Sequence, residues 1–319
     1  MNTKYKNLPI AIGDHKRQHI VVFSGAGMSA ESGLSTFRDE NGLWKQYDWQ
    51  RLASIEGFAE EPQAVLDFYN MRRKRLLEVE PNNAHRLIAE LEKWHDVTVI
   101  TQNVDDLHER AGTSKVIHLH GELKKVTSSE NRDDPNCIEE LPLDVPIRIG
   151  DKAADGSQLR PYIVWFGEFV NAMESAIEIV RMADIFVVVG TSLTVHPAAR
   201  LLHYAQRNIP KFIINPGKLE RIPDDYVHIK ENASSGMETF VDWVRENTGV
   251  VTLNIPMPPS WMFGITDIEI PEEYRNEELI RLTSRKKDES GIEIGEHPLF
   301  FNEKLDDCKE IFFSYLYKS

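Results

Sequence analysis

Residues 19–44, HIVVFSGAGMSAESGLSTFRDENGLW, join a short apolar run to a glycine-rich turn. Such a β-branched run is typical of a strand that is buried on both faces of a parallel sheet. Gly25 and Gly27 follow it directly, and they allow a tight turn that brings backbone amides near a phosphate at a helix start. The spacing differs from the G-x-G-x-x-G pattern, so the glycine pair alone would also fit a purely structural turn.

Three more apolar runs follow, at 96–103, 183–192 and 210–217. Between the runs lie segments with apolar residues at helical spacing, at 62–80, 82–95, 171–183 and 197–208. This alternation predicts an α/β fold with a doubly wound parallel sheet, which is a Rossmann-like arrangement. The ligand crevice of such a sheet lies at the carboxyl ends of its strands, where nearly all the motifs below are found.

Two stretches break this pattern. Residues 122–161 are polar and rich in turn formers, and they predict a small inserted module. Residues 250–319 form a C-terminal extension of unknown role, whose last amphipathic segment, 305–317, is apolar enough to be buried.

Composition excludes several classes of function. The formal net charge of −14 argues against nucleic-acid binding and suits cationic partners such as lysine-rich protein segments. No run approaches the roughly 18 apolar residues of a membrane span, and the N-terminal residues carry no export signal. Two cysteines, Cys137 and Cys308, are too few for a disulfide framework. We therefore expect a cytoplasmic globular protein without membrane contact.

The longer pattern GAG-x-S-x-x-S-G-L-x-x-F-R is far more specific than the glycine pair. With it come QNVDDLHERAG (102–112), HLHG (118–121), VWFGE (164–168), GTSLTVHPA (190–198) and INPG (214–217). Through these motifs and their order, the chain resembles the sirtuins from about residue 15 to residue 245. The resemblance implies a catalytic domain over 15–245 that uses NAD to remove acyl groups from lysine side chains of proteins. It leaves the oligomeric state open.

The resemblance also implies the residues that bind NAD. Arg38 would supply a bidentate phosphate donor, and Asn103 and Asp105 suit the ribose hydroxyls and the nicotinamide amide. Phe37 could cover the sugar after nicotinamide leaves, although ordinary packing would explain it equally well. The full expected set is Gly25, Ala26, Gly27, Ser29, Glu31, Phe37, Arg38, Trp44, Gln102, Asn103, Asp105, Gly190, Thr191, Ser192, Asn215 and Ala233.

Catalysis is assigned to His120 and Asn103. A histidine here could be a satisfied core residue. His120 stands beside Gly121 and matches the catalytic histidine of the family, whereas His118 is interpreted as structural. The implied reaction begins when the acyl-lysine oxygen attacks the nicotinamide ribose. His120 then takes a proton from a ribose hydroxyl as general base.

The protein substrate is expected along Val164, Trp165, Phe166, Gly167 and Glu168, which resemble an edge strand that pairs with a peptide, and at Val195. Tyr69 and Arg72 share a helix face, and a phenol with a guanidinium can bind a carboxylate. From spacing alone, Tyr69 could be core and Arg72 part of a solvated RRKR run. Sirtuins that remove succinyl and malonyl groups carry this pair, together with a small residue at the position of Ala53.

In one respect the chain departs from the family pattern. Most sirtuins hold a structural zinc with two C-x-x-C pairs, whereas residues 122–161 contain Cys137 alone and no histidine. Because structural zinc needs four N or S ligands, we predict no zinc. Apolar residues would then hold the module, namely Ile138, Leu141, Leu143, Val145 and Ile147.

Two other functions compete with the deacylase. The first is NAD hydrolysis or ADP-ribosyl transfer, which needs neither the VWFGE segment nor the Tyr69–Arg72 pair. The second is a non-catalytic sensor of NAD or ADP-ribose, which the presence of His120 and Asn103 disfavours.

Overall fold

The computed structural model describes residues 5–11, 17–36, 48–217, 219, 222–248, 250–256, 297–299 and 311–313. The chain forms two compact units, Gln18–Thr239 on the one hand and Met1–Arg17 with Phe240–Ser319 on the other. Among the described residues, no helix is both long and apolar enough to cross a membrane.

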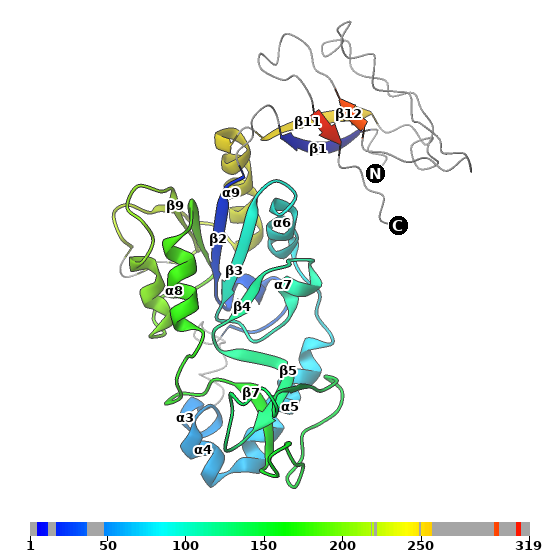
Figure 1. Ribbon diagram of the computed structural model, residues 1–319, viewed down its shortest axis with the longest axis vertical. Helices are drawn as coiled ribbons and strands as arrows, with labels where there is room; N and C mark the ends of the chain where they lie inside the picture. Colours follow the sequence, from blue (N-terminus) through cyan, green and yellow to red (C-terminus); the bar gives the residue numbers. More distant parts are fainter. Residues whose placement is uncertain are drawn as a thin grey trace, which may run out of the picture. The chain divides into compact units, whose positions relative to one another are not determined.

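The larger unit is built on a six-stranded parallel sheet in the order β10-β9-β8-β2-β3-β4 (Figure 1). The strands are β2 (His19–Ser24), β3 (Asp96–Thr101), β4 (Val116–His118), β8 (Ile185–Val189), β9 (Lys211–Ile214) and β10 (Val227–Ile229). The chain moves from β2 outward through β3 to β4, and then returns to β8 and moves the other way. The prediction of a doubly wound parallel sheet is therefore confirmed, and the direction of winding reverses between β2 and β8.

Both faces of this sheet are covered. On one face, Val21 and Phe23 of β2 pack in a cluster with Ala176 and Val180 of α8 (Met173–Arg181). The alternate residues of β2 point to the other face and are fully buried as well, while α6 (Asn83–Leu91) contacts β3. Burial on both faces explains why these strands are continuously apolar in the sequence.

The helices follow the predicted segments with shorter bounds. α5 (Pro62–Leu76) begins with proline in its first turn, and α6 is capped by Asn82, whose side chain accepts hydrogen bonds from two backbone amides. The segment 197–208 forms only a 3₁₀ helix, η1 (Ala198–His203). The remaining helices among the described residues are α1 (Gly27–Ala30), α3 (Trp49–Leu52), α4 (Ile55–Glu60), α7 (Leu107–Arg110) and α9 (Ala233–Thr248).

The inserted segment folds as a three-stranded antiparallel sheet of β6 (Glu139–Glu140), β5 (Gly121–Ser128) and β7 (Leu159–Ile163). Its buried cluster contains Ile147, as expected, and also Val126 and Leu159, which the sequence reasoning did not name. Val145 is 41% exposed, so its assignment to the packing of the module was wrong. Val145 lies in a turn, and its backbone carbonyl rather than its side chain makes the contact with α5.

Two side chains of α5 hold this module. Arg73 is fully buried, and its guanidinium donates hydrogen bonds to the carbonyls of Leu123, Leu141, Pro142 and Val145. Burial lowers the pKa of Arg73. Three residues earlier, Asn70 donates to the carbonyl of Ile147 at 2.8 Å and accepts from its amide at 2.9 Å. The RRKR run is therefore not simply a solvated face.

A second polar cluster ties the ends of the module together. The Ser128 hydroxyl donates to Asp155 at 2.6 Å and lies 2.8 Å from the Ser157 hydroxyl, and the Asn131 amide donates to the same carboxylate at 3.0 Å. These hydrogen bonds hold the pKa of Asp155 well below its usual range. Side-chain hydrogen bonds thus join residues 128–131 to residues 155–157 of the module.

The smaller unit contains strands that the sequence did not reveal. β1 (Tyr5–Ala11) pairs antiparallel with β11 (Val250–Pro256), and β12 (His297–Leu299) pairs antiparallel with β13 (Ile311–Phe313). The apolar segment 305–317 thus contributes β13. The role of residues 250–319 stays open.

Candidate functional site

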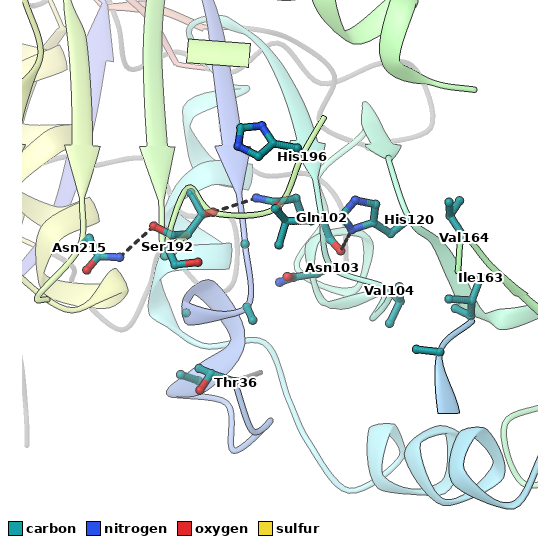
Figure 2. A pocket seen from close by; sticks show the side chains of 18 of the residues that line it. Thr36, Gln102, Asn103, Val104, His120, Ile163, Val164, Ser192, His196 and Asn215 are labelled. Atoms are coloured by element: carbon teal, nitrogen blue, oxygen red, sulfur yellow. Dashed lines mark hydrogen bonds between the residues drawn. The ribbon is translucent and has the colours of Figure 1, made fainter. Parts of the chain in front are cut away.

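A cavity of about 750 Å³ lies at the carboxyl ends of the parallel strands. Its walls include the loops that follow β2, β3, β8 and β9, so it occupies the crevice that the reversal of winding creates. Figure 2 shows Gln102, Asn103 and His120 on one side and Ser192 and Asn215 on neighbouring loops. Its size falls within the range of roughly 300–1,000 Å³ that is usual for ligand pockets.

The loops after β2 and β8 interlock through glycines. Gly190 has a φ of +63°, and a Cβ there would lie 2.2 Å from the Met28 amide nitrogen. The Gly25 amide donates to the Val189 carbonyl at 3.0 Å, and the Gly27 amide donates to the Gly190 carbonyl at 2.7 Å. These two amides are therefore occupied. The glycines thus permit the close approach of two backbones, and phosphate binding at this turn stays a prediction for the other amides of the loop.

A chain of polar contacts crosses the floor of the cavity. The Gln102 side-chain amide donates to the Thr191 hydroxyl at 2.9 Å, and the Asn215 amide donates to the Thr191 carbonyl at 3.1 Å (Figure 2). The three residues follow β3, β8 and β9 respectively. The network thus fixes three loops relative to one another.

His120 has the geometry of a base. Its Nδ1 lies 3.1 Å from the backbone carbonyl of Gln102. A carbonyl can only accept, so Nδ1 carries the proton and Nε2 keeps its lone pair. Burial lowers the pKa of His120, which keeps the imidazole neutral near pH 7. The side chain lines the cavity.

His118 differs in kind, and its contacts agree with a structural role. Its Nδ1 lies 2.9 Å from the Asn103 carbonyl and its Nε2 lies 2.7 Å from a Glu109 carboxylate oxygen. Both partners accept, so the ring is fully protonated. Burial opposes that charge, but Glu109 outweighs it and the pKa of His118 is raised. Glu122 lies close to the pair and is itself bound by Lys125 at 2.6 Å.

Asn103 is held from behind the cavity wall. Its side-chain amide donates to the Ser29 hydroxyl at 3.0 Å, and that hydroxyl donates to the Asp105 carboxylate at 3.0 Å. Burial raises the pKa of Asp105. Ser29 and Asp105 do not line the cavity themselves. We therefore interpret them as residues that orient Asn103 from below.

The opposite wall contains the predicted acyl residues. Ala53, Tyr69 and Arg72 all line the cavity. The Arg72 guanidinium carbon lies 5.7 Å from the centre of the Tyr69 ring. Burial lowers the pKa of Arg72, while Tyr69 and Asp105 act in the opposite direction. Tyr69 and Ala53 belong to an apolar cluster with Val104, Ile163 and Trp165, so Arg72 is a cation on the wall of a largely apolar chamber.

Residues 164–168 are not a strand, because β7 ends at Ile163. The Val164 amide donates to the His120 carbonyl at 2.9 Å, and the Phe166 amide donates to the Ala53 carbonyl at 2.9 Å. The Trp165 amide donates to the Glu168 carboxylate at 2.7 Å. The segment is therefore not an edge strand in this structure, and its pairing with a substrate peptide stays a prediction.

The structure brings most of the expected residues to this one cavity. Those that line it are Gly25, Ala26, Gly27, Glu31, Ala53, Tyr69, Arg72, Gln102, Asn103, His120, Val164, Trp165, Phe166, Gly167, Glu168, Gly190, Thr191, Ser192, Val195, Asn215 and Ala233. Phe37, Arg38 and Trp44 lie outside the described residues. The sequence reasoning missed Ala30, Thr36, Val104, Ile163, Val170, His196, Pro197, Ile214, Pro216, Gly217, Leu219 and Asn232. His196 and Pro197 stand inside a quoted motif, and their adjacency to Val195 was the available signal.

Comparison with known proteins gives a consistent result. Residues 25–197 match the Sir2 family. An NAD-dependent protein deacylase of Bacteroides thetaiotaomicron is 54% identical over 223 residues, which covers 69% of this chain and 95% of the relative. A solved Sir2 homologue in complex with ADP-ribose is 38% identical, with a TM-score of 0.65, and the match covers 73% of this chain and 94% of that one. A solved complex of a Sir2 homologue with NAD is also 38% identical, with a TM-score of 0.63, 73% of this chain and 91% of that chain being covered.

Proposed function

Since the chain belongs to the Sir2 family and is a homologue of NAD-dependent protein deacylases, we propose that it removes succinyl and malonyl groups as well as acetyl groups from lysine side chains. The products would be the free lysine, nicotinamide and O-acyl-ADP-ribose. The observation that carries the acidic-acyl part is the placement of Arg72 and Tyr69 on the wall of the cavity that also contains His120 and Asn103.

The residues present suit NAD. Gln102, Ser192 and Asn215 present amides and a hydroxyl, and these come from loops that the Thr191 contacts hold together. Such groups can hydrogen-bond ribose and phosphate oxygens. When bound, NAD supplies a ribose carbon that carries a good leaving group. The cavity walls position that carbon and exclude bulk water from it.

The chain's own groups then handle the proton. His120 Nε2 is unprotonated and faces a cavity, so it can take a proton from a sugar hydroxyl. The carbonyl of Gln102 holds the ring so that Nε2 stays the basic nitrogen. Asn103 is fixed through Ser29 and Asp105, which gives it a single orientation for a polar contact with NAD or the acyl oxygen.

The acyl end is matched by charge and by size. A succinyl or malonyl chain ends in a carboxylate, which a half-buried guanidinium and a phenol can bind. Ala53 leaves space where a larger side chain would narrow the chamber. The surrounding apolar cluster lowers the local dielectric and so strengthens the attraction between Arg72 and the carboxylate.

A panel of acetyl, malonyl and succinyl peptides tests the proposal. We expect Arg72→Met to lower kcat/KM for succinyl peptide at least tenfold more than for acetyl peptide, because one charge-assisted hydrogen bond is worth about 1.5–3 kcal/mol. Arg75→Met is the matched control, because Arg75 lies in the same helix and pairs with Glu78 on the surface. Equal loss on both peptides would contradict the acidic-acyl function. Nicotinamide release at full rate without any peptide would favour NAD hydrolysis instead.

A further inference from the structure

The part of the cavity wall formed by Ala53, Tyr69 and Arg72, here called the acyl wall, contains a hydrogen bond that fixes the direction of the Tyr69 hydroxyl proton. The indole nitrogen of Trp165 lies 3.0 Å from the hydroxyl oxygen of Tyr69. Both side chains are buried, with exposed fractions of 2% and 1%. An indole N–H can only donate, so the Tyr69 oxygen accepts, and the phenol's own proton is left for a different acceptor.

Trp165 is itself held firmly. The Arg160 guanidinium stacks on its ring, with the carbon 3.3 Å from the ring centre. Arg160 is fixed in turn by two contacts with the Glu168 carboxylate, at 2.8 and 3.1 Å, and Arg132 contacts the same carboxylate at 3.0 Å. Glu168 also accepts from the Trp165 backbone amide. The indole therefore has one position, and its N–H has one direction.

The phenol stays protonated in this setting. Burial is the largest influence on Tyr69, and it raises the pKa above the usual value of a phenol. Tyr69 and Arg72 line the cavity together. A proton-bearing phenol whose oxygen already accepts one hydrogen bond is a directed donor, and a carboxylate in the cavity is a suitable acceptor.

We propose that Trp165 is a specificity-determining positioning residue, whose indole N–H orients the Tyr69 hydroxyl to donate its proton to the terminal carboxylate of an acidic acyl chain. This inference rests on the proposed acidic-acyl function. An acetyl group has no terminal carboxylate, so the hydrogen bond between Trp165 and Tyr69 gives it no such contact. Trp165 thereby affects the choice between acyl groups rather than the transfer reaction itself.

A double-mutant cycle tests the proposal through kcat/KM on succinyl and acetyl peptides. We expect Trp165→Phe to lower the succinyl value about fivefold to tenfold more than the acetyl value, which corresponds to one neutral hydrogen bond. In a Tyr69→Phe background, Trp165→Phe should cause no further selective loss, because the oxygen it orients is gone. Trp94→Phe is the matched control, because Trp94 is not among the residues that line the cavity.

The outcomes separate the two claims. If the wild-type protein does not act on succinyl or malonyl peptide, the acidic-acyl function falls and this inference falls with it. If the wild type desuccinylates but Trp165→Phe keeps the ratio of succinyl to acetyl activity, or adds its full selective loss to Tyr69→Phe, the inference alone is overturned. Should Trp165→Phe fail to fold, site-specific benzothienylalanine at 165 keeps the ring shape and replaces the N–H by sulfur. The same ratio then decides.

Discussion

Replacing Arg73 by methionine tests how the inserted module is held to the rest of the larger unit. The guanidinium is fully buried and donates to carbonyls of β5 and of the 141–145 segment. Methionine fills a similar volume and donates nothing. After the substitution, either the carbonyls keep their positions and lose these hydrogen bonds, or the 141–145 segment moves away from α5.

The magnitude follows from which carbonyls water can reach. The carbonyls of Leu141, Pro142 and Val145 belong to residues with some exposure and can be hydrated after the substitution. The Leu123 carbonyl belongs to a buried residue and loses its partner, whereas the other three exchange a hydrogen bond to a charged donor, worth about 1.5–3 kcal/mol, for one to water. Removing the cost of burying the guanidinium offsets part of this loss, so we expect a net destabilisation of roughly 2–4 kcal/mol. For a domain of this size, that is a drop in Tm of roughly 5–15 °C.

Thermal unfolding followed by circular dichroism measures the effect, with urea unfolding as a second measure. Lys74→Met is the control, because Lys74 is the exposed neighbour in the same run of charges and should shift Tm by less than about 2 °C. Arg73→Lys should recover only part of the stability, since one ammonium cannot reach all the carbonyls. A Tm for Arg73→Met that matches the control would refute the view that Arg73 holds the module.

Three further predictions concern protonation and metal content. Burial lowers the pKa of His85 to about 3 and that of His108 well below its usual value, so the unfolded chain takes up protons first and the free energy of unfolding should fall as pH drops from about 6.5 toward 3. Urea unfolding at several pH values measures this, and His85→Asn should flatten the slope; an unchanged slope would contradict the assignment. Because burial lowers the pKa of His120, deacylation should lose activity only below about pH 6.5, and a pH profile of kcat/KM measures this. The His120→Ala variant should lose deacylation but still bind NAD, as measured by calorimetry. Elemental analysis should find no stoichiometric zinc, and a chelator should leave Tm unchanged; one bound zinc per chain would show that the prediction from the missing cysteines is wrong.

The parts of the fold that could be predicted are those governed by local pattern. β2, β3, β8 and β9 lie between two layers of helices, so burial makes each of them apolar throughout, and this signal is visible in a single sequence. The β1–β11 pair joins segments more than 200 residues apart and has no such signature. The cavity could be located because loops at the ends of parallel strands meet at one edge of the sheet.

The features that were missed depend on contacts between distant segments. Arg73 looks like part of a solvated charge run, and only the turn at 141–145 makes it a buried donor. The glycines after β2 look like amide donors, but Gly190 and Val189 already accept their hydrogen bonds. The bond from Trp165 to Tyr69 joins residues 96 positions apart. In each case the sequence pattern singles out the residue, whereas the identity of its hydrogen-bond partner depends on how the chain folds.

One turn of α5 supports two distinct structures. Tyr69 and Arg72 face the cavity, while Asn70 and Arg73, each one residue further along, grip the inserted module. A compound that binds against the acyl wall and stiffens residues 69–73 of α5 would therefore slow amide hydrogen exchange across 141–147, although it touches none of those residues. By thermodynamic reciprocity, a binder that clamps the module would tighten the same compound's affinity by an equal factor. Binding to the outer surface of the module would thus change the affinity of the acyl wall for its ligands from a distance.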